Sequence, residues 1–345
     1  GWAKYIDWTP EMVEKGIANL DKEVDVLCVS ETGKTFTRGG MENEVIDYSI
    51  SVVGPSDESL HALEYAKSLG YRIWAKIQVN NSWECSAVPY LPVFSLMTEH
   101  IKKLKKIGVS GLMLGWSLGG YPGGALPLCN MVCGEGEVDE TAWYKAVYAQ
   151  NSELVKSCVN KFCEAFKEYP FSVEALYFGG QNMGAGNMWS LKKDERISTM
   201  VCFTFDDYER WAKPYGLEVF TSQYAKLCGK WKVALDELNA VTGNAAFEEL
   251  KTMATGAYIQ FSEAYNIALL CKYKTDLNKY RDEIARLIAV ERENALTAYE
   301  LVLKDARVGY EASNHYFFNS NLLLEKLLNL KELENQLKGE NDENI

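Results

Sequence analysis

The amino-acid sequence predicts an α/β fold in which half of a (β/α)8-type barrel, with a parallel sheet of four strands, is followed by a mostly helical domain. Two observations predict it. Over residues 21–124, short runs rich in β-branched residues alternate with amphipathic helical spacing, the pattern of a parallel sheet with crossover helices. From about residue 139 the apolar residues recur with helical spacing almost to the end of the chain. We therefore expect two domains, the half barrel over 1–138 and the helical domain over 139–345.

The expected strands are short, and each one ends in polar or acidic residues. They cover Val24–Ser30, Val45–Val53, Ile73–Val79 and Ser110–Ser117. The third alternates apolar and polar residues, as side chains do on the two faces of a pleated strand. The residues at or just after their carboxyl ends include Glu31, Ser51, Glu84 and Ser117. In barrel enzymes the chemistry lies at this end of the strands.

A half barrel leaves two strand edges unpaired, and isolated proteins avoid such edges because their free N–H and C=O groups pair with other chains. We therefore expect these edges to be covered by an N-terminal barrel half that lies upstream in a longer polypeptide, or by a second copy of the chain. The abrupt start of the sequence at Gly1-Trp2 fits the first alternative.

Helical patterns separate the strands and fill the second domain. They cover Thr9–Leu20, Ser56–Leu69, Val93–Ile107, Thr141–Phe166, Phe220–Leu238, Ala245–Tyr273, Leu277–Ala306 and Asn321–Leu337. The first begins with Thr9 as N-cap and Pro10 in the first turn. Two irregular stretches remain, a Gly-containing loop after Thr32 and the region 171–208, whose centre is the glycine-rich run Gly179–Asn187.

Composition excludes several classes of function. The net charge is −12 and the basic residues are dispersed, so nucleic acid and anionic membrane surfaces are poor partners. No apolar run approaches the ~20 residues of a membrane span. The nine cysteines lie mostly within apolar patterns, which indicates reduced core thiols and a cytoplasmic protein. Cys129 and Cys133 have no second Cys or His pair nearby to complete a metal site, and no cofactor fingerprint occurs.

Glu84 and Glu31 are the candidate catalytic residues, because each is a carboxylate placed directly after a strand. Hydrolysis of a glycosidic bond uses two carboxyl groups roughly 5–9.5 Å apart, one of which donates a proton. An apolar wall such as Trp83 raises the pKa of a neighbouring acid. The competing interpretation is that each Glu forms a salt bridge with a nearby base such as Lys34 or Lys76.

Aromatic and amide side chains near the same strand ends suit a sugar, since aromatic faces stack on pyranose rings and amides bind hydroxyls. The candidate substrate-binding residues are Gln78, Asn80, Asn81, Trp83, Trp116, Tyr121, Gln181, Asn182, Asn187, Glu311, Asn314 and His315. Each also has a structural alternative. A single Trp can plug the barrel mouth, the glycine-rich loop can be a plain connector, and His315 can form a hydrogen bond between domains.

Several long motifs resemble the C-terminal half of a bacterial glycoside hydrolase family. They are VSETGK from Val29, VIDYSISVVGP from Val45, AKIQVNNSWECSAVPYLPV from Ala75, GLMLGWSLGGYP from Gly111, MVCFTFDDYERW from Met200 and GYEASNHYFF from Gly309. The resemblance implies a (β/α)8 barrel with a C-terminal helical region that acts on sugars, and it transfers no catalytic pair.

The sequence therefore predicts a glycoside hydrolase that works by acid/base catalysis without a metal, with Glu84 as the first candidate acid and Glu31 as the second. The rival hypothesis is a non-catalytic carbohydrate-binding or scaffold protein that uses the same aromatic and amide groups. A hydrolase needs two converging carboxyl groups, whereas a binding protein does not. For Glu84 we expect a carboxylate that points into a concave pocket walled by Trp83 or Trp116.

Overall fold

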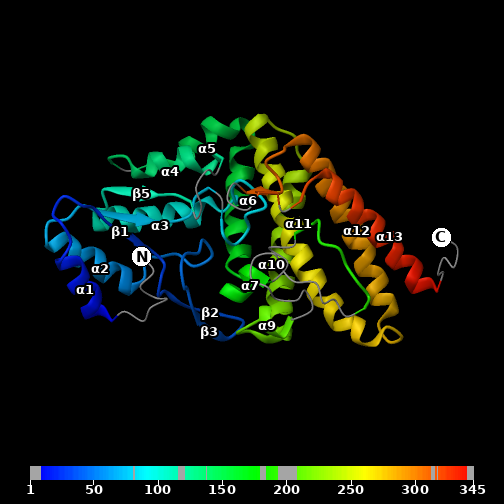
Figure 1. Ribbon diagram of the computed structural model, residues 1–345. Helices are drawn as coiled ribbons and strands as arrows, with labels where there is room; N and C mark the ends of the chain where they lie inside the picture. Colours follow the sequence, from blue (N-terminus) through cyan, green and yellow to red (C-terminus); the bar gives the residue numbers. More distant parts are fainter. Residues whose placement is uncertain are drawn as a thin grey trace.

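The computed structural model describes residues 9–80, 82–115, 121–136, 138–178, 184–192, 208–311, 315–316 and 318–339. A small parallel sheet and its helices form one end of the molecule, and long helices form the other (Figure 1). Helices make up most of the described chain, so the fold is a mixed α/β fold dominated by helices.

The parallel sheet consists of β1 (Val26–Val29), β4 (Ile73–Lys76) and β5 (Gly111–Met113), side by side in that order. Both pairings are parallel. Helix α2 (Asp57–Ser68) connects β1 to β4, and α3 (Phe94–Ile107) connects β4 to β5. The predicted alternation of strands and helices is therefore confirmed for three of the four expected strands.

The prediction of a strand over Val45–Val53 is wrong. The segment is irregular and mostly buried, and a hairpin precedes it, formed by β2 (Thr35–Arg38) and β3 (Met41–Glu44). The two-residue turn of this hairpin is Gly39-Gly40, with φ of +56° and +78°, as a turn that needs positive φ at both positions requires. The described sheet therefore has three strands, and a half barrel of four strands is not formed in it.

One face of the sheet is covered and the other is half exposed. Ile73 and Ala75 of β4 are buried on the covered face, where α2 packs against β1 and β4. On the opposite face, Leu27 is 39% exposed, and the ring of Trp74 lies across the backbone of its neighbour Gly111. The Trp74 indole donates a hydrogen bond to Asp25 (2.8 Å).

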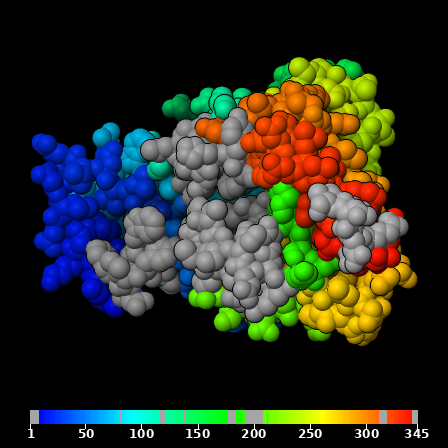
Figure 2. All heavy atoms as spheres, turned by 45° about the vertical axis from the view of Figure 1, so that its right-hand side comes forward, coloured from blue at the N-terminus to red at the C-terminus, as the bar shows by residue number. Residues whose placement is uncertain are grey.

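The helical part is a chain of neighbouring helices. After α5 (Glu140–Tyr148) come α6 (Ser152–Phe166), α10 (Gly216–Asn239), α11 (Ala245–Tyr273), α12 (Arg281–Lys304) and α13 (Ser320–Lys338). Along this series α6 packs on α10, α10 on α11, α11 on α12, and α12 on α13. Figure 2 shows α12 and α13 together on the surface of this part.

Shorter elements complete the described chain. They are α1 (Pro10–Ala18), α4 (Ala125–Cys133), α7 (Val173–Phe178), α9 (Tyr208–Trp211), the 3-10 helices Ala149–Asn151 and Lys274–Asp276, and the two-residue strands β6 (Tyr310–Glu311) and β7 (His315–Tyr316). The helix expected over Thr141–Phe166 is instead two helices, because Ala149 has a φ of +50° and interrupts it. Helix α11 matches its predicted bounds.

An aromatic cluster joins the helices. Trp231 of α10 lies 4.4 Å from Phe162 of α6 and 5.2 Å from Phe261 of α11, between ring centroids. Its indole N–H donates to the Ala254 carbonyl (2.9 Å), so the buried polar group of this large side chain is satisfied. The core of the helices is continuous with the apolar residues around β4, including Ile77 and Val79.

The cysteines of the described residues form no disulfide, and Cys133 is exposed while the others are buried or half-buried. No described helix combines the length and the apolar composition that crossing a bilayer requires.

We predict that Gly111→Ala destabilises the protein by about 1–3 kcal/mol, because the new methyl group would overlap the Trp74 ring and force the sheet or the indole to move. Gly229→Ala is the matched control. It lies inside α10 with no atom within 4 Å of the added carbon, so it should stabilise the protein by about 0.5–1 kcal/mol. Urea unfolding measures both changes, and equal effects would contradict the packing argument.

Candidate active site

Glu31 and Glu84 lie at the same end of the parallel sheet. Glu31 follows β1 by two residues, and continuing the register of Val29 opposite Lys76 sets Glu31 opposite Gln78. The chain continues from β4 through Gln78 to a tight turn, in which Ser82 and Cys85 form an antiparallel β-bridge. Glu84 lies within this turn. The two carboxyl groups are close enough that the charge of Glu84 raises the pKa of Glu31.

Glu84 is fully buried, and its carboxylate accepts hydrogen bonds from the irregular segment that replaces the expected strand. Oε1 accepts from the hydroxyls of Ser49 (2.6 Å) and Ser51 (2.5 Å) and from the Ser51 N–H (3.1 Å). Oε2 accepts from the Ile50 N–H (2.6 Å). The expectation that this carboxylate points into an open pocket is therefore wrong, because its oxygens are enclosed by residues 49–51.

Burial raises the pKa of Glu84, and the hydrogen bonds from Ser49, Ser51 and Ile50 oppose that increase because they favour the charged form. Residues 49–51 also have a partner in the hairpin of β2 and β3. Arg38 of β2 donates to the Ser51 carbonyl (2.8 Å), and its charge lies near Glu84. The carboxylate therefore serves as the acceptor around which residues 49–51 are arranged.

Glu31 is also fully buried, but its environment is different. Neither of its carboxyl oxygens has a hydrogen-bond partner among the described residues. Burial raises its pKa well above 4.5, and the charge of Glu84 adds to the increase. The backbone amides of Glu31 and Ser49 lie close to the carboxyl group, although neither meets the geometry of a hydrogen bond, and they oppose the increase together with the charge of Lys76. The Lys76 ammonium group lies over the Tyr48 ring, 4.4 Å from its centroid.

His100 of α3 contacts Glu31 and Ser30. Its Nδ1 lies 3.5 Å from Glu31 Oε1, and its Nε2 shares a hydrogen bond with the Ser30 hydroxyl (2.7 Å). Burial lowers the pKa of His100 to about 3, so the ring is neutral near neutral pH. A methyl group on Gly54 would come within 3.2 Å of both His100 and Glu31, which shows how closely the chain covers this pair.

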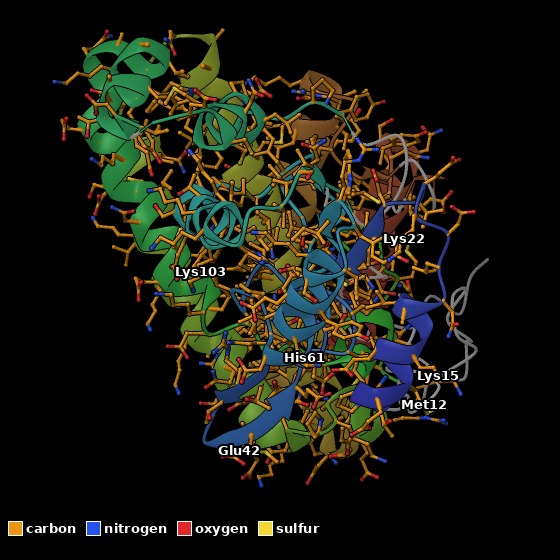
Figure 3. All side chains as sticks on the ribbon, turned by 90° about the vertical axis from the view of Figure 1, so that its left-hand side faces the viewer. Met12, Lys15, Lys22, Glu42, His61 and Lys103 are labelled. Carbon is orange, nitrogen blue, oxygen red and sulfur yellow. The ribbon has the colours of Figure 1, made fainter. Side chains whose placement is uncertain are left out.

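His100 is not among the candidate site residues predicted from the sequence. It is 5% exposed, whereas His61 of α2 is exposed (Figure 3). Helical spacing could have identified it, because His100 follows Met97 by three residues and precedes Leu104 by four, and both are buried in α3. Ser49 and Ser51 carried no comparable signal, since their role depends on a carboxylate more than thirty residues away.

Gln78 and Asn80 bring further buried polar atoms to this end of β4. Gln78 Oε1 accepts from the Trp83 N–H (2.5 Å), while Gln78 Nε2 and Asn80 Oδ1 have no hydrogen-bond partner among the described residues. Trp83 is 3% exposed and packs on Tyr48 and Phe171, so it is a core residue and not an open sugar platform. Buried polar atoms without partners are rare in native proteins and concentrate where a ligand or water binds.

Among the other predicted binding residues, Tyr121 and Asn187 have described side chains, and both contact residues of the helical part or the chain that follows it. Tyr121 is 39% exposed, and its ring lies 6.0 Å from that of Tyr310. Asn187 belongs to a buried cluster in the helical part. Asn81, Trp116, Gln181, Asn182 and Asn314 lie outside the described residues, as do the side chains of Glu311 and His315.

No known protein family matches the sequence, and a search of curated proteins finds no match. Among solved structures, the fold is similar to that of a GH138 enzyme targeting pectin rhamnogalacturonan II, with a TM-score of 0.48 and 10% sequence identity. The similarity covers 96% of this chain and 55% of that protein, so the chain spans about half its length. In the described part of the chain, no group of His, Cys, Asp and Glu side chains is arranged to hold a metal ion.

We predict that Glu84→Gln destabilises the protein by about 1–3 kcal/mol, because an amide NH2 would then face hydroxyl and N–H donors from residues 49–51. Glu164→Gln is the matched control, since it removes an exposed ion pair with Lys167 and should change stability by less than about 1 kcal/mol. Urea unfolding at neutral pH measures both. An unchanged stability in Glu84→Gln would show that the carboxylate does not organise this segment.

Proposed function

We propose that this chain is part of a glycoside hydrolase that cleaves glycosidic bonds by acid/base catalysis, with Glu31 as the general acid. The observation that supports this is a buried carboxyl group with unpartnered oxygens, next to a second carboxyl group, at the carboxyl ends of parallel strands. A general acid must hold its proton near neutral pH, and burial together with a neighbouring negative charge produces that state.

In this proposal the order of the two candidates is reversed relative to the sequence prediction. The Glu84 oxygens accept hydrogen bonds from residues 49–51. The Glu31 oxygens form no hydrogen bond with a described residue, although the Glu31 and Ser49 amides and the His100 ring lie close to them. Glu84 then contributes its charge, which helps Glu31 to keep its proton. His100 is a positioning residue, because its neutral ring links the Glu31 carboxyl to Ser30.

Substrate access requires a rearrangement around Glu31, since this residue is fully buried. A second barrel half, or another copy of the chain, would complete the sheet and form the remaining wall of the site. The half-exposed face that carries Leu27 and Trp74 supports such a partner, because apolar groups there gain by being covered. Gln78 and Asn80 would supply a donor and an acceptor for sugar hydroxyls.

A non-catalytic carbohydrate-binding or scaffold protein is the second candidate function. It is favoured by the complete burial of both carboxyl groups and by the structural bonds of Glu84. In that case the amides would still bind a sugar, but no proton transfer would occur.

We predict that Glu31→Gln lowers turnover of the complete protein on a panel of aryl glycosides by about 10²-fold or more, while sugar binding survives. The substitution keeps the shape and removes the proton that the acid donates. Turnover of the unchanged protein should fall as pH rises through the raised pKa of Glu31, because the acid is then ionised. Turnover is measured against pH, and binding is measured by calorimetry.

The control is Glu64→Gln, on the exposed side of α2, which should turn over like the unchanged protein. Equal turnover in Glu31→Gln and the control would remove Glu31 from the mechanism. Sugar binding by the unchanged protein without turnover on any glycoside would favour the second candidate function.

A further inference from the structure

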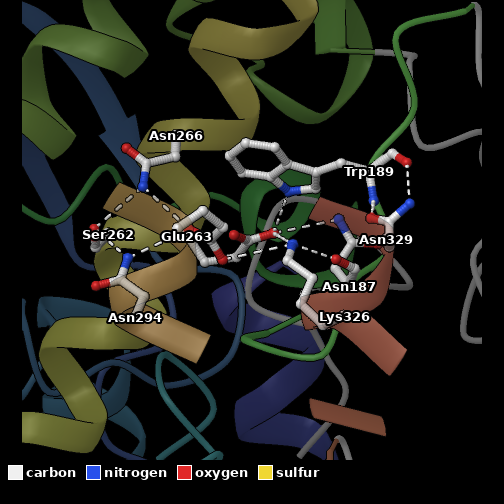
Figure 4. A network of polar contacts seen from close by, with 9 residues as sticks. Asn187, Trp189, Ser262, Glu263, Asn266, Asn294, Lys326 and Asn329 are labelled. Atoms are coloured by element: carbon white, nitrogen blue, oxygen red, sulfur yellow. Dashed lines mark hydrogen bonds and ion pairs between the residues drawn. The ribbon is translucent and has the colours of Figure 1, made fainter. Parts of the chain in front are cut away.

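A second group of buried ionisable side chains lies in the helical part, apart from the parallel sheet (Figure 4). Glu263 is on α11, Glu291 on α12 and Lys326 on α13, and all three side chains are fully buried. Lys326 Nζ lies 3.8 Å from Glu263 Oε1 and 3.5 Å from Glu291 Oε1. The three side chains therefore join three helices through one site.

Each carboxyl group uses one oxygen as an acceptor. Glu263 Oε1 accepts from the Trp189 indole (3.0 Å) and from the Asn187 side-chain amide (3.3 Å). Glu291 Oε2 accepts from the side-chain amides of Asn266 (3.1 Å) and Asn294 (3.3 Å). The remaining oxygens, Glu263 Oε2 and Glu291 Oε1, form no hydrogen bond with a described residue, and Glu291 Oε1 has only the ion-pair contact with Lys326 at 3.5 Å.

A single proton between the two carboxyl groups satisfies both of these oxygens. The Glu263 and Glu291 side chains are within hydrogen-bonding reach of each other. If Glu263 carries a proton on Oε2, it donates to Glu291, and its other oxygen still accepts from Trp189 and Asn187. Without that proton, two carboxylates would lie within hydrogen-bonding reach of each other, and neither of these oxygens would have a hydrogen bond from a described residue.

A count of the charges in the site also favours one shared proton. One ammonium group and two carboxylates would leave a net charge of −1 in a fully buried site, and burying an unbalanced charge is strongly unfavourable. With one shared proton the site is neutral. Neither Arg292 nor Lys274 is placed by its contacts to balance this charge, since Arg292 of α12 pairs with Glu334 of α13, and Lys274 binds the Ser190 and Lys192 carbonyls.

The site also fixes the segment Gly184–Lys192 on the helices. Lys326 donates to the Asn187 carbonyl, and its ammonium group lies 4.4 Å from the centre of the Trp189 ring. Asn329 of α13 forms two hydrogen bonds with the Trp189 backbone, at 2.8 and 3.0 Å. The segment is thus attached through Glu263, Lys326 and Asn329, and the interaction between Glu263 and Lys326 depends on the charge of the site.

We propose that Glu263 and Glu291 share one proton in the folded protein and that this proton makes the fixing of the Gly184–Lys192 segment dependent on pH. Glu263 is the protonated partner, and Glu291 and Lys326 form the buried ion pair. When the proton leaves, the two carboxylates repel each other, and the contacts of the segment with Glu263 and Lys326 weaken, while the hydrogen bonds from Asn329 and Lys274 remain.

The directions of the two pKa shifts agree with this assignment. Burial, followed by the charge of Glu291, raises the pKa of Glu263 well above 4.5, while Lys326 and the hydrogen bonds to Glu291 lower the pKa of Glu291 despite its burial. A carboxyl with a raised pKa holds a proton in the folded state that the unfolded chain releases. Its contribution to stability is therefore complete below about pH 4.5 and declines as pH rises toward the folded-state pKa.

The first test is the pH dependence of unfolding, compared between the unchanged protein and Glu263→Gln. Between the unfolded and folded pKa of Glu263, the equilibrium constant for unfolding should rise about tenfold more per pH unit in the unchanged protein than in the variant. The Gln amide can donate to Glu291 as the acid does, so the variant should also be at least as stable at neutral pH. Glu164→Gln, an exposed control, should keep the original pH dependence.

The same pH dependence in the unchanged protein and Glu263→Gln would overturn the proposal. If Glu263→Gln does not fold, Glu291→Gln decides the question. With one carboxyl left beside Lys326, Glu263 should ionise, and the additional proton release should disappear in that variant as well.

The second test measures hydrogen exchange of the Asn187 and Trp189 amides, which donate to Gly184 O and Asn329 Oδ1. After correction for the intrinsic effect of pH, their protection should fall at alkaline pH in the unchanged protein and remain in Glu263→Gln. Protection that declines equally in both proteins would show that the shared proton does not hold the segment.

Discussion

The Glu84 carboxylate determines how the end of the parallel sheet is built. It takes the place of a neighbouring strand by accepting hydrogen bonds from the Ile50 and Ser51 amides, which would otherwise need a ladder partner. Residues 45–53 can therefore pass through the interior without being a strand. Because these residues enclose the region beyond β1 and β4, the environment of Glu31 also depends on this acceptor.

Two pairs of buried acids in the described part of the chain are stabilised in different ways. Glu31 and Glu84 lie at the end of the sheet, where amides and hydroxyls form hydrogen bonds with the Glu84 carboxylate and none with Glu31. Glu263 and Glu291 meet between helices, whose backbone amides are already used within the helices, so side-chain amides and a lysine serve as donors. In both places the protein keeps one carboxyl group whose pKa is raised well above its usual value.

The sequence predicted those parts of the structure that depend on local periodicity. Helix α11 has the predicted bounds, and β1, β4 and β5 lie parallel in chain order, which is why Glu31 and Glu84 meet at one end of the sheet. The error at Val45–Val53 has a physical cause, since its apolar residues are buried as in a strand, but its amides bind a side chain distant in sequence. No local pattern contains that information.

The side-chain environments at the candidate site could not be predicted from the sequence either. The position of Glu84 after a strand was predictable, but its enclosure by hydroxyls was not. Trp83 next to Glu84 suggested an open aromatic platform, whereas the indole packs into the core. The ion pairing of Lys326 with two acids could not be read from its own helix, because the partners come from two other helices.

The exposure of Cys133 makes this residue a suitable position for attaching a probe. Within the described part of the chain it is the exposed cysteine, and it ends α4, the helix that packs against α3 beside the parallel sheet. A maleimide fluorophore or spin label would therefore attach there in preference to the more buried thiols. Burial raises the pKa of Cys133 above its usual value, so labelling should proceed faster in mildly alkaline buffer. One probe at Cys133 would then report on the sheet end of the protein.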